Sequence, residues 1–434
     1  MQQESRSAWA LDEVPRHIVW KATFFFCGLI CVSPGLGLVS EALAVGISAV
    51  TSAAALIWIA LAIRPRELAF VSQIGMAFLA AASLLPIWMA FQTLPLGVLA
   101  HPVWLQAADA LQHPLNGSVT IDAGLTVRTI LICLAGLCVA IVAAAIAVDS
   151  RRASWLAGAT LASGIAHGVT TSLEIALARA GNEPAMSPLV PLLIIQVGVA
   201  DALEVLGTRK STIRALALPA AAVASSLLLL GFIARDRALV AALAGLFIVS
   251  LVWAFKRFRA PAFAAAATAA SLIGLAAFTM VALRPNPELP LVIGFADQQD
   301  GNLQRSLAVL ADAPALGTGA GTLAALLPTY SESSTESRVA LSTAAAGFVV
   351  EFGKFAALVF AAGLMVLVGI FFLGALDRGR DWFYCAAAGG GLVALMVGSF
   401  RMPTMFSTSD VFVLGTVLGC AISQRVSRTR SQDF

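Results

Sequence analysis

Apolar stretches long enough to cross a membrane recur along almost the whole chain, and polar breaks separate them. A helix needs about 20 apolar residues to cross the hydrocarbon core of a bilayer. Of the 434 residues, 59% are hydrophobic and 12% are charged, whereas about 25% of the residues in a soluble domain are charged. These features predict an all-α polytopic membrane protein.

The apolar stretches predict about twelve transmembrane helices. They cover residues 19–39, 42–63, 68–90, 125–148, 155–178, 189–206, 215–233, 238–255, 262–283, 343–373, 383–400 and 411–423. The tenth is long for one span, so we expect its first part to be an entry segment or a tilted extension. Two long polar segments, 91–124 and 284–342, interrupt the series.

The basic residues predict the orientation of these spans. With a cytoplasmic N-terminus, about eighteen of the 27 Lys and Arg residues lie on the inner side, and every inner loop carries at least two. This is the distribution that the positive-inside rule requires. We therefore expect residues 1–18 and 424–434 to be cytoplasmic tails. Residues 19–283 then hold helices 1–9 with an outer loop at 91–124, and residues 343–423 hold helices 10–12.

About nine basic residues remain on the outer side, where the orientation rule does not explain them. They are Arg128, Arg179, Arg235, Arg237, Arg284, Arg305, Arg338, Lys354 and Arg401. Outer loops of very unequal length favour a surface with a function over a simple conduit.

The cysteines and the acidic residues indicate neither a disulfide framework nor a metal site. All six cysteines lie in apolar stretches, where they are expected to be small buried hydrophobic residues. The GTGAG sequence at 317–321 lacks the preceding strand and the following Gly-Lys-Ser/Thr of a nucleotide loop. We expect no metal, no cofactor and no nucleic-acid partner.

A very short outer turn carries Arg235, Asp236 and Arg237 between the seventh and eighth predicted spans. Charged residues at membrane depth usually face a cavity or a partner. One interpretation is therefore a cationic site that faces the outer leaflet. The other is a capped turn, in which a local arginine–aspartate pair and long side chains reach the interface.

The polar segment after the ninth span contains Arg305 on a predicted short helix, with Asp300 as its N-cap. Pro314 ends this helix, and the glycines of 317–321 lead into a second one. We expect an amphipathic hairpin that lies on the membrane surface with its apolar face toward the lipid. A lone arginine on such a helix is usually only solvated.

Two arginines at the outer leaflet suit one kind of ligand. Guanidinium groups bind phosphate oxygens in a bidentate manner and keep their charge. They can also stabilise the negative charge that develops when a glycosyl bond to a pyrophosphate breaks.

The outer segment reads as an arginine, a short helix, a Pro-x-x-Gly-x-Gly turn and an aromatic-ended helix, and a Glu-x-Gly helix follows. In this order the chain resembles the O-antigen ligase and polysaccharide polymerase family of polytopic glycosyltransferases. The family's small-residue–arginine–small motif resembles Asp236–Arg237–Ala238, with Arg235 as a nearby substitute. The other matching residues are Arg305, Pro314, Gly317, Gly319, Pro328, Thr329, Tyr330, Glu351, Phe352 and Gly353.

The resemblance implies a fold like the GT-C glycosyltransferases in the bacterial inner membrane, with a metal-independent reaction at the periplasmic face. The implied donor is a saccharide on undecaprenyl or another polyprenyl pyrophosphate, and the acceptor is a second glycan. Arg237 and Arg305 would be catalytic, and Arg235, Arg237, Arg305 and Glu351 would bind substrate. Other polysaccharide-assembly proteins are possible partners.

The chain departs from the family's pattern at one place that matters for the reaction. The ligases carry a histidine about nine residues before the glutamate, and this chain has Ala340, Leu341, Ser342 and Thr343 there. A serine does not act as a general base at neutral pH. His101, His113 and Glu351 are candidate substitutes, and Glu351 has a structural alternative as a cap or as a partner of Lys354.

The missing histidine favours a polymerase or a divergent member over a ligase that transfers glycan to the lipid A core. An inactive homologue or a non-catalytic assembly partner is a further alternative. A secondary transporter or flippase would show two matched halves, but the long outer segment has no counterpart in the first half of this chain.

Overall fold

The computed structural model describes residues 16–63, 65–178, 187–207, 213–233, 235–258, 289–296, 303–330, 341–379 and 381–425. Within these ranges every regular element is a helix, as predicted. The elements are α2 (Arg16–Val32), η1 (Ser33–Leu38), α3 (Glu41–Ala62), α4 (Pro65–Thr93), η2 (Gly97–Leu99), α5 (Val103–Leu111), α6 (Ala123–Ile146), α7 (Ser150–Ala178), α8 (Leu189–Gly207), α9 (Ile213–Ile233), α10 (Arg235–Phe258), α12 (Leu303–Asp312), α13 (Leu323–Leu326), η3 (Leu327–Tyr330), α14 (Ala344–Phe352), α15 (Lys354–Asp377), α16 (Trp382–Ser399) and α17 (Asp410–Gln424).

Nine helices in the described part of the chain are long and apolar enough to cross a membrane. They are α2 with η1, α3, α4, α6, α8, α9, α10, α15 and α16. Helices α7 and α17 also coincide with predicted spans, and α17 is apolar but shorter than the nine. The predicted span 262–283 lies outside the described residues. The chain is therefore an all-α polytopic membrane protein.

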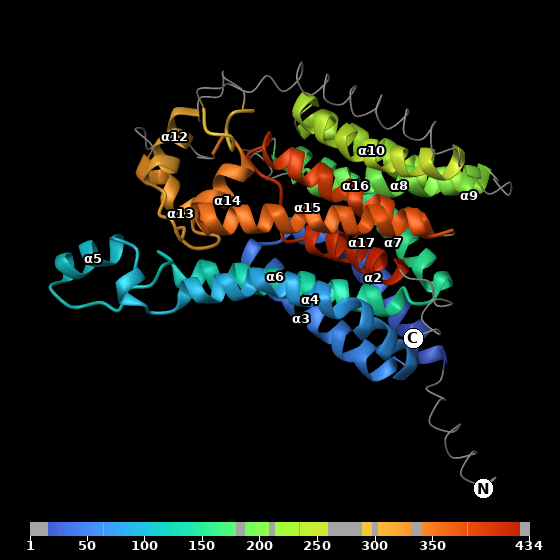
Figure 1. Ribbon diagram of the computed structural model, residues 1–434, viewed down its shortest axis with the longest axis horizontal. Coiled ribbons are helices and arrows are strands. Elements are labelled where there is room, and N and C mark those ends of the chain that lie inside the picture. Colours follow the sequence, from blue (N-terminus) through green and yellow to red (C-terminus); the bar gives the residue numbers. More distant parts are fainter. Residues whose placement is uncertain are drawn as a thin grey trace, which may run out of the picture.

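Small residues allow the long helices to pack closely side by side (Figure 1). A Cβ atom on Gly415 or Gly419 of α17 would come closer than 3.0 Å to atoms of α6. The same holds where Gly245 of α10 meets Gly390 of α16. Close backbone approach at small residues is a common way for helices to associate in lipid.

Large apolar side chains on several of these helices point away from the bundle. Ile57 and Leu61 on α3, and Phe355 and Leu358 on α15, are exposed. So much exposed apolar surface is unusual in a soluble monomer and is expected where lipid surrounds the helices.

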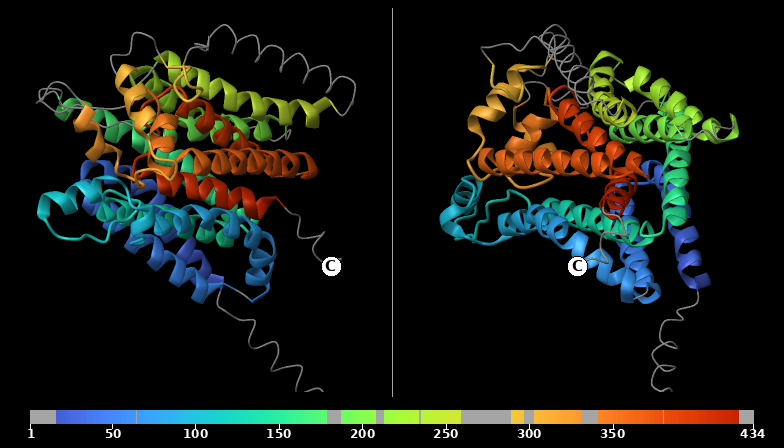
Figure 2. Two further views of the ribbon diagram at one scale, coloured as in Figure 1. Left: turned by 60° about the vertical axis from the view of Figure 1, so that its left-hand side comes forward. Right: turned by 45° about the vertical axis from the view of Figure 1, so that its right-hand side comes forward.

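We call the end of the bundle at which α6, α8, α10 and α17 begin the outer end, in keeping with the predicted topology. Figures 1 and 2 show α12, α13 and α14, drawn in gold and orange, gathered at this end. In Figure 1, helix α5 projects beyond the bundle on the same side. No residue of α5 is buried.

The run 343–373 is longer than one span, and its first part forms a separate entry segment, one of the two expected arrangements. The structure divides this run at Gly353 into α14 and α15, and the candidate membrane span begins only at Lys354. Gly353 has φ 85° and ψ 156°, a conformation that almost only glycine adopts. The helix must therefore end there, and α14 forms the expected entry segment.

The prediction that the apolar face of the Arg305 helix lies toward the lipid is wrong. Val309 and Leu310 of α12 are buried in a small core that includes Leu341, just before α14, and Val350, near its end. Helix α12 thus packs against α14 and does not lie with that face toward lipid, because a protein surface is available to cover it. The predicted cap Asp300 lies outside the described residues.

Candidate functional site

Hydrogen bonds of residues 341–344, at the start of α14, link this helix to α12, which carries Arg305. The Ser342 N–H donates to the Ser306 hydroxyl at 2.9 Å, and that hydroxyl donates to the Ser342 hydroxyl at 3.1 Å. Both serines are buried. The Thr343 hydroxyl donates to the carbonyl oxygen of Val292 at 2.6 Å and caps α14 by accepting from the Ala346 N–H. These bonds hold α12 at a fixed place against α14.

The loop between α16 and α17 meets the same short segment from the other side. The Ala344 N–H donates to the carbonyl oxygen of Met402 at 2.6 Å. Phe400 packs edge-on against Phe295, with ring centroids 6.4 Å apart. Arg401 lies between these two contacts and is half-buried, as Arg305 is. The two arginines therefore flank residues 342–344.

Asp410 anchors the far end of this loop. Its carboxylate is fully buried and accepts from the Ser187 hydroxyl at 2.5 Å, the Ser407 N–H at 2.6 Å and the Ser407 hydroxyl at 2.8 Å. A buried carboxylate is stable only when such donors replace water. The network joins the start of α8 to the start of α17 and fixes the loop that carries Arg401.

We expect Asp410→Ala to lower the thermal stability of the detergent-purified protein clearly. The loss of about 3 kcal/mol follows from several donors left without an acceptor in the interior. Asp410→Asn, which keeps one acceptor oxygen, should cost less. Asp312 is the matched control, because its carboxylate accepts from the Tyr330 hydroxyl at an exposed position. A melting temperature that falls no further for Asp410→Ala than for Asp312→Ala would contradict the anchoring role.

Helix packing brings Arg237 to the level of the same loop. Helices α10 and α16 are antiparallel and touch at Gly245 and Gly390. Eight residues further toward the outer end on each helix, Arg237 is level with Gly398, because both helices rise 1.5 Å per residue. The Arg401 N–H donates to the carbonyl oxygen of Gly398 at 2.9 Å. Arg237 is half-buried there.

The structure thus places the two predicted catalytic arginines at one end of the bundle. It also places Arg401 there, one of the outer basic residues that the orientation rule does not explain. The available signal was an arginine directly after an apolar span on the outer side, in the sequence SFRMP. Arg235 begins α10, and its side chain lies outside the described part of the structure.

Two of the motifs behind the family resemblance, the Pro-x-x-Gly-x-Gly turn and the Glu-x-Gly segment, meet in space. The glycine turn at 317–321 packs on the C-terminal end of α14, where the Gly319 N–H donates to the Glu351 carbonyl oxygen at 3.1 Å. The Gln92 amide, at the end of α4, donates to the carbonyl oxygens of Leu316 and Glu351 at 2.9 Å each. Residues far apart in the chain therefore hold the turn in one shape.

The Glu351 carboxylate acts as a cap in this arrangement. It accepts from the Leu323 N–H at 3.0 Å, at the start of α13. Burial raises the pKa of the Glu351 carboxyl to about 6, and the N–H groups of Gly321 and Leu323 act against this rise. Ser306 of α12 bonds to Ser342, just before α14, whereas Thr318 of the glycine turn bonds to Val350, near the end of α14. Glu351 therefore lies at the opposite end of α14 from Arg305.

We expect the pH dependence of stability to report on Glu351. Its pKa is higher in the folded protein than the ordinary value of 4.5. The folded protein therefore favours the protonated carboxyl. This contribution to the free energy of unfolding is fully present below about pH 4.5 and is lost as the pH rises through about 6. Glu351→Gln keeps an acceptor for Leu323 and removes the charge, so its melting temperature should not fall between these pH values, whereas Glu351→Ala should melt lower at every pH. A wild-type pH profile shared by Glu351→Gln would contradict this assignment.

The two outer histidines do not lie beside the arginines. His101 accepts from the Val103 N–H at 3.3 Å next to α5, and His113 bonds the carbonyl oxygen of Pro114 at 2.9 Å. The loop after α5 meets the glycine turn instead, where the Ile121 N–H donates to the Thr318 carbonyl oxygen at 2.9 Å. Ser342, at the position of the family's histidine, is the residue that lies next to the helix of Arg305.

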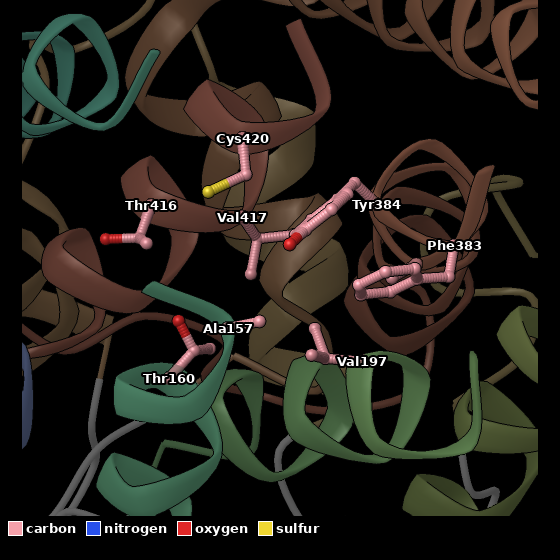
Figure 3. Close-up of a pocket in the computed structure, with 9 residues that line it drawn as sticks. Ala157, Thr160, Val197, Phe383, Tyr384, Thr416, Val417 and Cys420 are labelled. Atoms are coloured by element: carbon pink, nitrogen blue, oxygen red, sulfur yellow. The ribbon is translucent and has the colours of Figure 1, made fainter. Parts of the chain in front are cut away.

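A cavity of about 20 Å³ lies in the other half of the bundle, near the start of α16 (Figure 3). Thr160, Tyr384, Thr416 and Cys420 line it together with apolar side chains. This volume suits a single water molecule, so the cavity is too small for a saccharide or a lipid head group. Among the described residues, no three His, Cys, Asp or Glu side chains are grouped to hold a metal ion.

Comparison of the chain with protein-family models, with curated proteins and with solved structures finds no match. The function is therefore inferred from the geometry at the outer end of the bundle.

Proposed function

We propose that the protein is a membrane glycosyltransferase that joins polyprenyl-pyrophosphate-linked saccharide units at the periplasmic face. Its product would be a surface polysaccharide, such as an exopolysaccharide or O-antigen. The observation that carries this proposal is the gathering of half-buried arginines at the outer end, around a loop and a short helix held by buried hydrogen bonds. The proposal includes about twelve spans, a GT-C-like architecture, cytoplasmic termini and the bacterial inner membrane.

In this proposal Arg237 and Arg305 hold the pyrophosphate of the donor. The bond between the anomeric carbon and the phosphate oxygen breaks, and the acceptor hydroxyl oxygen forms a new bond to that carbon. The products are the glycoside, a polyprenyl pyrophosphate with one more negative charge, and the proton of the hydroxyl. Guanidinium groups stabilise the charge that develops on the leaving oxygen.

The protein contributes to catalysis mainly by positioning and by leaving-group stabilisation. Ser342 is engaged with Ser306, and the Glu351 carboxylate is engaged with a backbone N–H. Glu351 then acts as a positioning residue that shapes the glycine turn. A polymerase, whose acceptor is another lipid-linked unit, accords with the absence of the family's histidine better than a ligase does.

Deletion of the gene tests this function through the length of the cell's surface polysaccharide. A polymerase predicts that only single repeat units remain. Intact lipid-linked polymer that is not attached to lipid A core would indicate a ligase. Uptake of a fluorescent lipid-linked saccharide into vesicles, with no elongation, would indicate a transporter or flippase. Unchanged polysaccharide in the deletion strain would reject an assembly role altogether.

A further inference from the structure

We propose that Arg401 is a third cation of the site and binds the pyrophosphate as it leaves. This inference rests on the proposed function and adds a residue that the family resemblance did not supply. It deepens the chemistry of that site, because it assigns to Arg401 the negative charge that appears only when the sugar leaves.

The position of Arg401 is set by contacts on both sides of it. Phe400 packs on Phe295, and the Met402 carbonyl oxygen accepts from the Ala344 N–H. Ala344 is two residues from Ser342, which bonds to Ser306 beside Arg305. Since a chain advances at most about 3.6 Å per residue, the backbones beside Arg305 and Arg401 are close. A diphosphate bound beside residues 342–344 would be the ligand common to both arginines.

Backbone hydrogen bonds fix the chain at Arg401. The N–H groups of Arg401 and Met402 both donate to the Gly398 carbonyl oxygen at 2.9 Å. The buried Asp410 network holds the other end of the loop. A cation on a fixed backbone loses little freedom when charge develops near it, which is the condition for effective electrostatic stabilisation.

Charge balance gives Arg401 its part in the reaction. A glycosyl polyprenyl pyrophosphate is a diester with two negative charges, which Arg237 and Arg305 can balance. Loss of the sugar turns the outer phosphate into a monoester, whose additional ionisation has a pKa of about 6. A third arginine would therefore interact more strongly with the departing group than with the bound donor. Such differential binding raises kcat more than it lowers KM.

The direct test compares the affinity of the detergent-purified protein for two soluble probes. Farnesyl pyrophosphate carries the charge of the leaving group, and its methyl diester carries the charge of the donor. Arg401→Gln should weaken binding of farnesyl pyrophosphate by about tenfold or more and leave binding of the diester almost unchanged. Arg401→Lys keeps the charge without the bidentate geometry. Its affinity for farnesyl pyrophosphate should lie between those of the wild type and Arg401→Gln.

Arg128→Gln is the matched control. It removes an arginine from the outer part of α6, where that arginine forms an ion pair with Glu41 at 2.7 Å, and it should change neither affinity. Equal affinity of the wild type and Arg401→Gln for farnesyl pyrophosphate, or an equal loss for both probes, overturns the role of Arg401. A wild-type protein that binds neither probe overturns the proposed function itself. If Arg401→Gln does not fold, the comparison of the wild type with Arg401→Lys decides.

Discussion

Replacing Arg305 or Arg237 by alanine is expected to lower the rate of polysaccharide elongation by about 100-fold or more, since one donor at a developing oxyanion contributes a factor of about 10²–10³. Both side chains are half-buried at the outer end of the bundle, where an interaction with phosphate is stronger than in water. The measurement is elongation of a synthetic polyprenyl-pyrophosphate-linked oligosaccharide by purified protein, together with the polysaccharide length in a complemented deletion strain.

Arg128→Ala provides the control for a general loss of positive charge at the outer face, because Arg128 pairs with the exposed Glu41. Its elongation rate should stay within a factor of two or so, since exposed ion pairs contribute only about 0–1 kcal/mol. The double variant of Arg237 and Arg305 should show less than the product of the two single effects, because both residues act on one group. Polysaccharide of normal length in either single variant would refute the assignment of the site.

Gly353→Ala is expected to remove most of the correctly folded protein. The conformation of Gly353, with φ 85°, costs other residues about 1–3 kcal/mol. In addition, an added Cβ atom would come closer than 3.0 Å to the carbonyl oxygen of Ala315 and to the Gly317 N atom. Both effects act at the junction of α14, α15 and the glycine turn. Yield, elution profile and melting temperature in detergent measure the loss.

Gly363→Ala is the matched control, because it lies in α15 and a Cβ atom there would meet nothing within 4 Å. It should fold as well as the wild type, since alanine favours a helix over glycine by about 1 kcal/mol. If Gly353→Ala and Gly363→Ala behave alike, the turn does not constrain the outer end in the way described. Gly317→Ala is a second test of the same junction, because its Cβ atom would approach the Glu351 carbonyl oxygen.

The long helices could be predicted because their signal is local. A run of apolar residues long enough to cross a bilayer is a property of one segment, and each helix satisfies its own backbone hydrogen bonds. The predicted spans 42–63 and 383–400 accordingly differ from Glu41–Ala62 and Trp382–Ser399 by a single residue at each end. The run 343–373 was harder to predict, because apolarity continues through Gly353 while the backbone does not remain helical.

The candidate site could be predicted only in part. The arginines at 237 and 305 stood out because topology did not explain them, and both lie at the outer end. Their relation to Arg401 depends on the pairing of α10 with α16 and on one hydrogen bond from Ala344 to Met402. Neither contact follows from local sequence, because the residues are more than 50 positions apart in the chain.

The amino-acid sequence by itself determined the all-α membrane class, the places of most spans and the set of arginines without a topological reason. Only the tertiary structure decided that the glycine turn at 317–321 packs on the end of α14, that Glu351 caps α13 and that α12 covers its apolar face with α14. The physical reason is the range of the interactions. Apolarity and helix formation are decided within one segment, whereas caps, close glycine contacts and shared cationic sites require segments that the folding of the whole bundle brings together.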